Sequence, residues 1–253
     1  MAERRITPAT VREFNLKVQQ PDMNYKVASS FGEVLEAWCL VYRQYLAASL
    51  IGPNEFSIFT FPEYISNNTA VIIGKDGGQT VCTASAVLDS DRGLPLDNYY
   101  KNELDQLRAE GRNLIEVGLV ADSRKLENFS NVIELMNGIA RFGVYSKHLD
   151  YVVGIHPRRV NLYNRLWGFK PFGQKKDYAA LKTAPVVLLH LSGLDPQTRS
   201  LEMNQEIYSN TKDYNFDTRY KFNPQNFITS NEFSASVESF IRKIWHSKNL
   251  QRV

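Results

Sequence analysis

Glu116 is the residue that most constrains how this chain can fold, because it interrupts an otherwise apolar run. The run covers residues 113–122 and reads NLIEVGLVAD, which favours a buried strand. An isolated carboxylate is unfavourable to bury unless it is paired, hydrated or used in chemistry. Up to residue 169, the pattern then predicts a polar loop, a helix, a second strand and a short helix. Glu116 is therefore the first candidate for chemistry.

Hydrophobic periodicity predicts further elements around this segment. Ser30 and Glu33 form a capping-box pattern that opens a helix to about residue 48. The sequence KDGG at residues 75–78 predicts the turn of a hairpin. Strands are expected at residues 24–28, 70–74, 80–89, 113–121, 151–155 and 186–191, and helices at residues 96–111, 130–148 and 159–166. A hairpin followed by alternating strands and helices indicates an α/β (α+β) domain with a mixed sheet.

The chain divides into three parts by composition. Residues 1–23 form a loosely attached arm, residues 24–192 form the main domain, and residues 193–253 form a polar, aromatic-dotted extension. This extension ends in an amphipathic helix at about residues 230–246, and we expect it to pack on the same domain. Within the domain, residues 50–68 are rich in aromatics and broken by two prolines, which predicts a loop or flap lined with apolar groups.

Composition narrows the class of protein. The chain has 253 residues with 43% hydrophobic content, which allows a sizeable core. No run approaches the roughly 20 apolar residues that span a bilayer, so the default is a soluble cytoplasmic protein and not an integral membrane protein. Cys39 and Cys82 lie in apolar surroundings, which suits buried structural residues. The four histidines and two cysteines show no metal-ligand spacing, so no metal is expected.

Charge is unevenly distributed along the chain. The formal net charge of +3 is too small to indicate nucleic-acid binding, and none is expected. Residues 141–182, however, carry nine Lys or Arg against two Asp, a local net charge of +7. Such a concentration fits an anionic ligand or partner that docks on one face. The alternative is a solvated basic surface without a partner.

Several short motifs follow one another along the domain. They are VYRQY at residues 41–45, VLDS at 87–90, GLPLD at 93–97, LIEVGLV at 114–120, HPRR at 156–159, and Tyr163 followed by Gly168 and Phe169. Their order and spacing resemble the GNAT acyltransferase superfamily, and within it the FeeM-like N-acyl amino acid synthases, relatives of the acyl-homoserine lactone synthases. The resemblance covers about residues 25–191. It implies a mostly antiparallel central sheet flanked by helices, with the C-terminal helical extension outside it.

Two departures from the superfamily bear on the acyl donor. Relatives that use acetyl-CoA place a glycine-rich turn after the central strand, where backbone amides at a helix N-terminus bind pyrophosphate. Here the loop at residues 122–130 reads DSRKLENFS and contains no glycine. The closing motif is also one residue longer than usual, with four residues between Tyr163 and Gly168. Both departures resemble the FeeM-like group, in which the acyl group arrives on an acyl carrier protein.

The resemblance implies roles for three catalytic candidates. Glu116 would be the base that frees the attacking amine of its proton; the alternative is a structural carboxylate neutralised by Arg43 or another cation. Arg43 itself would either pair inward with such a carboxylate or extend to solvent. Tyr163 would protonate the leaving thiolate, or else be a core tyrosine. His156 is a further candidate base, although its place before Pro157 favours a structural role.

The same resemblance implies where the acyl donor binds. Amides around Gly118, Leu119 and Val120 would bind the pantetheine or the thioester carbonyl, with an ordinary sheet ladder as the alternative. Candidates for the remaining contacts are Arg124 and Lys125 for the phosphopantetheine phosphate, Arg158, Arg159 and Lys147 for carrier docking, and Phe56, Phe59, Phe61 and Trp38 for the acyl pocket.

The leading hypothesis is an N-acyltransferase that joins a long-chain fatty acyl group to the amine of an amino acid or a similar small amine. Its co-substrate would be an acyl-phosphopantetheine thioester on acyl carrier protein, or possibly acyl-CoA, with no tightly bound cofactor. One rival is an acetyl-CoA-dependent N-acetyltransferase of a small amine. Another is a non-catalytic module that binds an acyl chain or an acyl carrier protein on the same fold.

Overall fold

The computed structural model describes residues 23–66, 68–124, 129–182 and 184–193, together with the single residues 239 and 243. The expected N-terminal arm up to residue 22, Lys125, and the C-terminal extension with its helix at about residues 230–246 lie outside the described residues, apart from Gly193 and those two single positions. Within the described part, no helix is long and apolar enough to cross a membrane.

The elements agree with the sequence-based expectations to within a few residues. In chain order they are strand β1 (Met23–Val27), helix α2 (Phe31–Ala47), 3₁₀ turn η1 (Pro62–Tyr64), strands β2 (Thr69–Asp76) and β3 (Gln79–Leu88), helix α3 (Asp97–Ala109), strand β4 (Leu114–Asp122), helix α4 (Ser130–Ser146), strand β5 (Asp150–Ile155), turn η2 (Pro157–Arg159), helix α5 (Val160–Trp167), strands β6 (Lys170–Pro171) and β7 (Lys176–Tyr178), turn η3 (Ala179–Leu181) and strand β8 (Ala184–Ser192). The sequence did not predict β6 and β7, because strands of two and three residues are too short to show a period.

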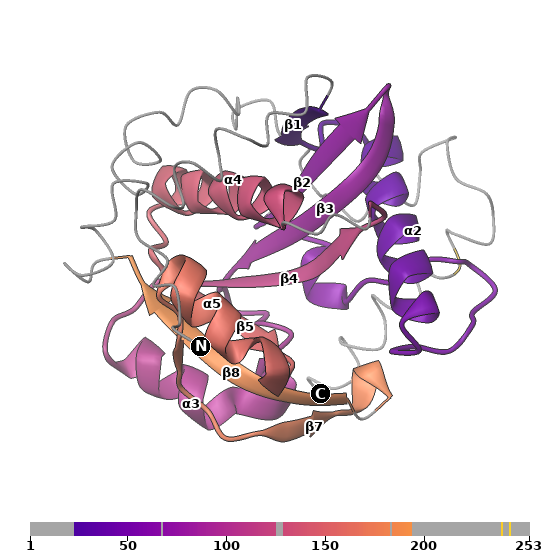
Figure 1. Cartoon of the computed structure of the whole chain (residues 1–253). Helices are drawn as coiled ribbons and strands as arrows, with labels where there is room; N and C mark the ends of the chain where they lie inside the picture. Colours follow the sequence, from indigo (N-terminus) through magenta and orange to yellow (C-terminus); the bar gives the residue numbers. More distant parts are fainter. Residues whose placement is uncertain are drawn as a thin grey trace, which may run out of the picture.

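The strands form one sheet in the order β1-β2-β3-β4-β5-β8-β6, with β7 paired to β8 (Figure 1). Among the described strands, β4 and β5 form the one parallel pair, and the other pairs are antiparallel. The mixed, mostly antiparallel sheet is therefore confirmed. The parallel pair lies in the middle of the sheet, so the strand that carries Glu116 has neighbours on both sides.

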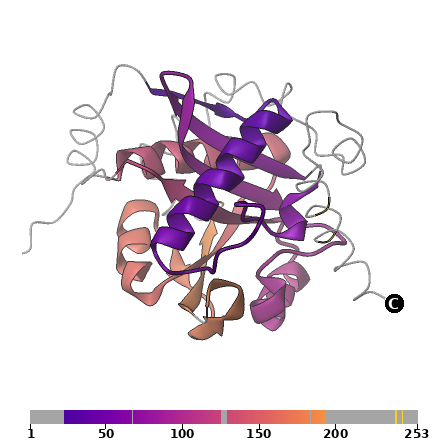
Figure 2. The ribbon, with the colours of Figure 1, turned by 90° about the vertical axis from the view of Figure 1, so that its right-hand side faces the viewer.

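Helices cover both faces of the sheet. Residues of α2 and α3 pack with Leu114 of β4 in one hydrophobic cluster, and Figure 2 shows α2 lying across this face. Residues of α4 and α5 pack with Ile115 and Val117 in a second cluster. Because successive side chains of a strand point to opposite faces, Glu116 points to the α2 and α3 side. The sheet thus places its one buried β4 carboxylate inside the first cluster.

The capping box that was read from the sequence begins α2 as expected. The Ser30 Oγ atom accepts a hydrogen bond from the Glu33 backbone N–H at 3.2 Å. Glu33 reaches back one residue further than the standard motif, because its Oε2 atom accepts from the Ser29 backbone N–H at 2.9 Å. Two backbone donors at the start of the helix are thereby satisfied, which fixes where α2 enters the fold.

Candidate functional site

Glu116 lies in the interior on β4, and no cation in the described part of the chain pairs with it. Glu116 is only 4% exposed. Its Oε2 atom accepts a hydrogen bond from the Leu96 backbone N–H at 2.9 Å. Burial raises the pKa of Glu116 well above its usual value; the Leu96 hydrogen bond opposes this rise, and the negative charges of Asp97 and Asp89 add to it. The carboxyl group therefore favours its protonated form, and it is a stronger base once ionised.

Arg43 does not neutralise Glu116, contrary to one alternative considered from the sequence. Arg43 is exposed on α2, and no ion pair joins its guanidinium to Glu116 in the described part of the chain. The apolar stripe of α2 is continuous without it, with Trp38 and Val41 fully buried. The long side chain of Arg43 lies on the solvent side of this stripe, so no ion pair with Arg43 opposes the burial that raises the pKa of Glu116.

A bulge interrupts β4 directly after Gly118. Ser85 of β3 pairs with Gly118 and Thr83 pairs with Ala121, so Leu119 and Val120 both lie opposite one residue of β3. Leu119 has φ at 50°, a left-handed conformation that costs a non-glycine residue on the order of 1 kcal/mol. Backbone strain of this kind is often kept where it serves a site.

The ladder between β4 and β5 ends at the same place. Val117 pairs with Val153 as the last partners of this parallel pair, although β4 continues to Asp122 and β5 to Ile155. Leu119 and Val120 consequently pair with no residue of β3 or β5 within the described sheet. Of the three residues predicted to bind the acyl donor, Gly118 keeps its β3 partner but has none on β5, and Leu119 and Val120 lie outside both ladders, which suits hydrogen bonding to a ligand.

Two tyrosines lie near this bulge from opposite faces of the sheet. Burial and the nearby Tyr163 raise the pKa of Tyr45, opposed by a hydrogen bond from the Val120 backbone. Tyr163 is 7% exposed and packs edge-on against Trp167 and Phe169, with ring centroids 4.9 and 5.9 Å away. Burial raises the pKa of Tyr163 to about 12, opposed by Arg159. Tyr163 therefore holds its proton at neutral pH and is able to donate it.

Arg108 holds the turn that supplies the Leu96 donor. Its guanidinium binds both oxygens of Asp89, with Nε to Oδ2 at 2.6 Å and Nη2 to Oδ1 at 2.9 Å. It also binds Asp97, with Nη1 to Oδ1 at 2.7 Å, and the Asp97 Oδ2 atom accepts from the Leu94 backbone N–H at 2.6 Å. The network fixes the segment between β3 and α3. Sequence analysis missed it, because charges on the polar face of a helix usually indicate solvated positions.

Of the two candidates for the donor phosphate, the structure describes only Arg124. Arg124 forms an ion pair with Asp76 at the end of β2, and Lys125 lies outside the described residues. Arg159 instead lies over the ring of Phe129, with its Cζ atom 5.2 Å from the ring centroid. Phe129 directly precedes α4. Arg159 thus brings a positive charge to the N-terminal end of α4, where the helix dipole also favours anions.

The carrier-docking candidates do not form one cluster. Arg158 and Arg159 are exposed in η2, at the end of α4 where Phe129 lies. Lys147 is also exposed, but it follows the last residue of the 17-residue helix α4, about 25 Å away along the axis. His156 accepts a hydrogen bond through Nδ1 from the Arg158 backbone N–H at 3.2 Å, which is a structural role in the turn.

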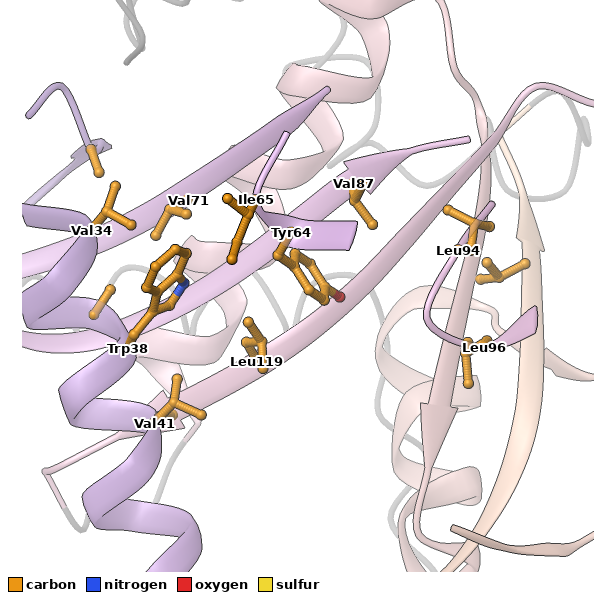
Figure 3. Close-up of a cluster of buried hydrophobic side chains, with 14 of the residues drawn as sticks. Val34, Trp38, Val41, Tyr64, Ile65, Val71, Val87, Leu94, Leu96 and Leu119 are labelled. Carbon is orange, nitrogen blue, oxygen red and sulfur yellow. The ribbon is translucent and has the colours of Figure 1, made fainter. Parts of the chain in front are cut away.

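Of the four acyl-pocket candidates, one is a fully buried core residue and three pack against the core while partly exposed. Trp38 is fully buried and packs among α2-side core residues, as Figure 3 shows. Phe56, Phe59 and Phe61 are partly buried against the same cluster. The centroid of the Phe59 ring lies 5.5 Å from that of Tyr45 and 5.3 Å from that of Phe61. An aromatic layer thus extends from the predicted flap to Tyr45, beside the bulge of β4.

Comparison with known proteins gives both a family and a fold. Residues 36–192 match the family model described as N-acyl amino acid synthase FeeM. None of the curated proteins compared with the chain matches its sequence.

Solved structures are similar to this one at low sequence identity. FeeM, an N-acyl amino acid synthase from uncultured soil microbes, has a TM-score of 0.62 and 23% identity, over 73% of this chain and 97% of that chain. The CoA-dependent acyl-homoserine lactone synthase BjaI, with SAM and isopentyl-CoA, has a TM-score of 0.53 and 12% identity, over 74% and 89%. A putative N-acetyltransferase from Lactobacillus plantarum has a TM-score of 0.50 and 12% identity, over 68% and 99%. These similarities confirm the expected GNAT-like fold.

Proposed function

Since the chain belongs to the family of the N-acyl amino acid synthase FeeM and is an N-acyltransferase, we propose that it transfers a long-chain acyl group from an acyl carrier protein to the amine of an amino acid or a similar small amine. The observation that carries this proposal is Glu116, a buried carboxyl group with a raised pKa that forms no ion pair with any residue the structure describes. It lies three residues before Leu119, where the bulge begins and β4 no longer pairs with β5.

Glu116 is the general base of this reaction. Amino acid amines are mostly protonated at neutral pH, and an unprotonated nitrogen is needed for attack. A carboxyl group with a raised pKa is closer in basicity to the amine than an ordinary carboxylate, so proton transfer to it is less uphill. Arg43 is exposed, and no other cation among the described residues forms an ion pair with Glu116. An incoming ammonium group is thus the natural partner of the Glu116 carboxylate.

The transfer then proceeds with balanced atoms and charges. The nitrogen lone pair attacks the thioester carbonyl carbon, and the π electrons of the carbonyl move to its oxygen. Glu116 has by then taken one proton from the ammonium group, which freed this lone pair, and the second proton that the nitrogen loses after the attack passes to solvent. When the carbonyl re-forms, the carbon–sulfur bond breaks, its electron pair leaves on sulfur, and Tyr163 gives a proton to the thiolate. The products are an amide and a free thiol; solvent returns a proton to Tyr163 and accepts the proton held by Glu116, so both residues regain their starting states.

The donor side supports a carrier protein over a nucleotide thioester. The loop at residues 122–130 has no glycine, so close backbone approach to a pyrophosphate is less favoured. Arg124 is engaged with Asp76, whereas Arg158 and Arg159 are exposed near the start of α4. Acyl carrier proteins are acidic, and an exposed arginine pair fits their docking by electrostatic steering. Phe56, Phe59 and Phe61 are proposed to line the path of the acyl chain.

The test of this function is an assay of purified protein with a long-chain acyl thioester and a panel of amino acids. The thioester is supplied either on acyl carrier protein or on CoA, and amide products are identified by mass spectrometry. We expect N-acyl products from the carrier-bound donor, at a higher kcat/KM than from CoA. Equal or better use of acyl-CoA would overturn the donor assignment, and acetyl transfer without long-chain transfer would overturn the substrate class.

Reversing one charge tests the docking site. Arg158→Glu is expected to raise the KM for acyl carrier protein about tenfold at low ionic strength, because rim charges act mainly through steering. The kcat with a short acyl-pantetheine thioester, which lacks the carrier, stays unchanged. Lys147→Glu is the matched control, because Lys147 is an equally exposed cation at the other end of α4. A larger effect from Lys147→Glu would place docking at that end instead.

A further inference from the structure

The hydroxyl group of Tyr64 is buried, and no described residue forms a hydrogen bond with it. Tyr64 is 0% exposed, and its Oη atom has no partner among the residues that the structure describes. Buried hydroxyl groups are normally hydrogen-bonded, and leaving one unsatisfied destabilises the fold. A phenylalanine would pack in the same place without this penalty. The hydroxyl therefore calls for a role outside packing.

Tyr64 lies over the strand that carries the proposed base. A side chain at Gly118 would collide with the Tyr64 hydroxyl, so the absence of a side chain there makes room for it. Figure 3 shows the hydroxyl pointing toward the strand that carries Leu119. Glu116 and Gly118 are two residues apart and lie on the same face of β4. The Tyr64 hydroxyl, the Glu116 carboxyl and the start of the bulge thus share one face of the strand.

Another buried tyrosine shows what a structural hydroxyl looks like in this fold. Tyr100 is also 0% exposed, and its hydroxyl donates to the carbonyl oxygens of Val186 at 2.8 Å and Gln174 at 3.0 Å. Its hydrogen-bonding capacity is used within the protein. Tyr64 differs in this one respect, and burial together with the nearby Glu116 raises its pKa well above the usual value. The Tyr64 hydroxyl therefore remains a donor at any working pH.

We propose that Tyr64 is a catalytic residue whose hydroxyl donates a hydrogen bond to the thioester carbonyl oxygen as that oxygen becomes negative. This role rests on the proposed function. The attacking nitrogen must lie near Glu116 and the carbonyl near the bulge, so the reacting atoms lie over Gly118, where the hydroxyl points. A donor held in a water-excluded interior stabilises developing charge far better than water does. Tyr64 is the last residue of the 3₁₀ turn η1, so its position over β4 is set by this turn.

Tyr64→Phe tests this role. With the carrier-bound donor we expect kcat to fall roughly 10- to 100-fold, as for loss of one oxyanion donor, while KM for the amine and for the donor changes less than about threefold. The melting temperature of the free protein stays the same or rises, because an unsatisfied hydroxyl has been removed. Tyr100→Phe is the matched control: it lowers the melting temperature, because two carbonyls lose their donor, and it leaves kcat unchanged.

A second variant tests the position of the hydroxyl. Gly118→Ala is expected to lower both kcat and the melting temperature, because the new methyl group displaces the Tyr64 hydroxyl. Adding Tyr64→Phe to it restores the melting temperature but not kcat. A kcat for Tyr64→Phe within about twofold of the wild type overturns the proposal, as does an increase in KM for the amine at unchanged kcat. A wild-type protein that forms no amide overturns the proposed function and this role together.

Discussion

Replacing Glu116 with glutamine is expected to lower kcat/KM about 10²- to 10⁴-fold, the range typical for loss of a general base. Glutamine has nearly the same shape and keeps an oxygen that can accept from the Leu96 backbone N–H, which Glu116 binds at 2.9 Å. It cannot accept the proton of the attacking amine. The measurement is the rate of amide formation from an acyl carrier protein thioester, and circular dichroism checks that the fold is retained.

The same substitution is expected to raise thermal stability at neutral and alkaline pH, although it lowers activity. The pKa of Glu116 is raised in the folded protein, whereas an unfolded glutamate titrates near about 4.3. Its contribution to stability is therefore fully present below about pH 4 and is lost as pH rises through the folded-state pKa. Glutamine does not titrate. The variant is consequently expected to melt at the same temperature as the wild type near pH 4 and at a higher temperature near pH 8.

The pH dependence of activity follows from the same shift. The wild type is expected to gain kcat/KM as pH rises through the raised pKa of Glu116, because only the ionised carboxylate takes a proton. The residual activity of Glu116→Gln lacks this limb. Glu110→Gln is the control, since Glu110 is exposed at the end of α3. More than half of the wild-type activity in Glu116→Gln, or a melting difference independent of pH, would contradict the role of Glu116.

Local patterns were enough to predict the elements that build the site. Ser30 and Glu33 give the start of α2 because both capping partners lie within three residues of each other. The apolar run around Glu116 gives β4, since its hydrophobic neighbours are adjacent in sequence. The burial of Glu116 follows from that run as well. Such features depend on short stretches of chain, and the sequence contains all of their physical causes.

The partners of the site residues were not predictable in the same way. Glu116 binds a backbone group 20 residues away, and no side-chain pattern reports which amide that will be. The apposition of Tyr64 and Gly118 joins residues from separate elements, and the bulge at Leu119 has no glycine to announce its left-handed backbone. The pairing of Arg43 with Glu116 was considered because charges attract, but α2 turns Arg43 outward. Tertiary packing decides each of these contacts.

Arg108→Met is expected to lower the free energy of unfolding by about 2 to 3 kcal/mol. Removing one partner of a buried ion pair typically costs 3–5 kcal/mol, and Arg108 is one quarter exposed, so solvent screening reduces the loss. Methionine keeps much of the aliphatic packing of Arg108 but carries no charge. Asp89 and Asp97 therefore lose their shared cation. The measurement is the urea midpoint at constant m-value.

Lys101→Met is the matched control for this prediction. Lys101 is on the same helix and binds Asp105 at 2.7 Å, an acid that Arg108 also contacts. Unlike Arg108, both members of the Lys101–Asp105 pair are exposed. We expect no measurable change, as for most surface pairs. Arg108→Met also affects the site, because Asp89 and Asp97 then act on Glu116 without a balancing charge. The pH at which kcat/KM rises is therefore expected to move to higher pH in Arg108→Met and to stay in place in Lys101→Met. If Arg108→Met lowered the free energy of unfolding by less than about 0.5 kcal/mol and left this pH unchanged, Arg108 would neither stabilise the turn before α3 nor affect the pKa of Glu116.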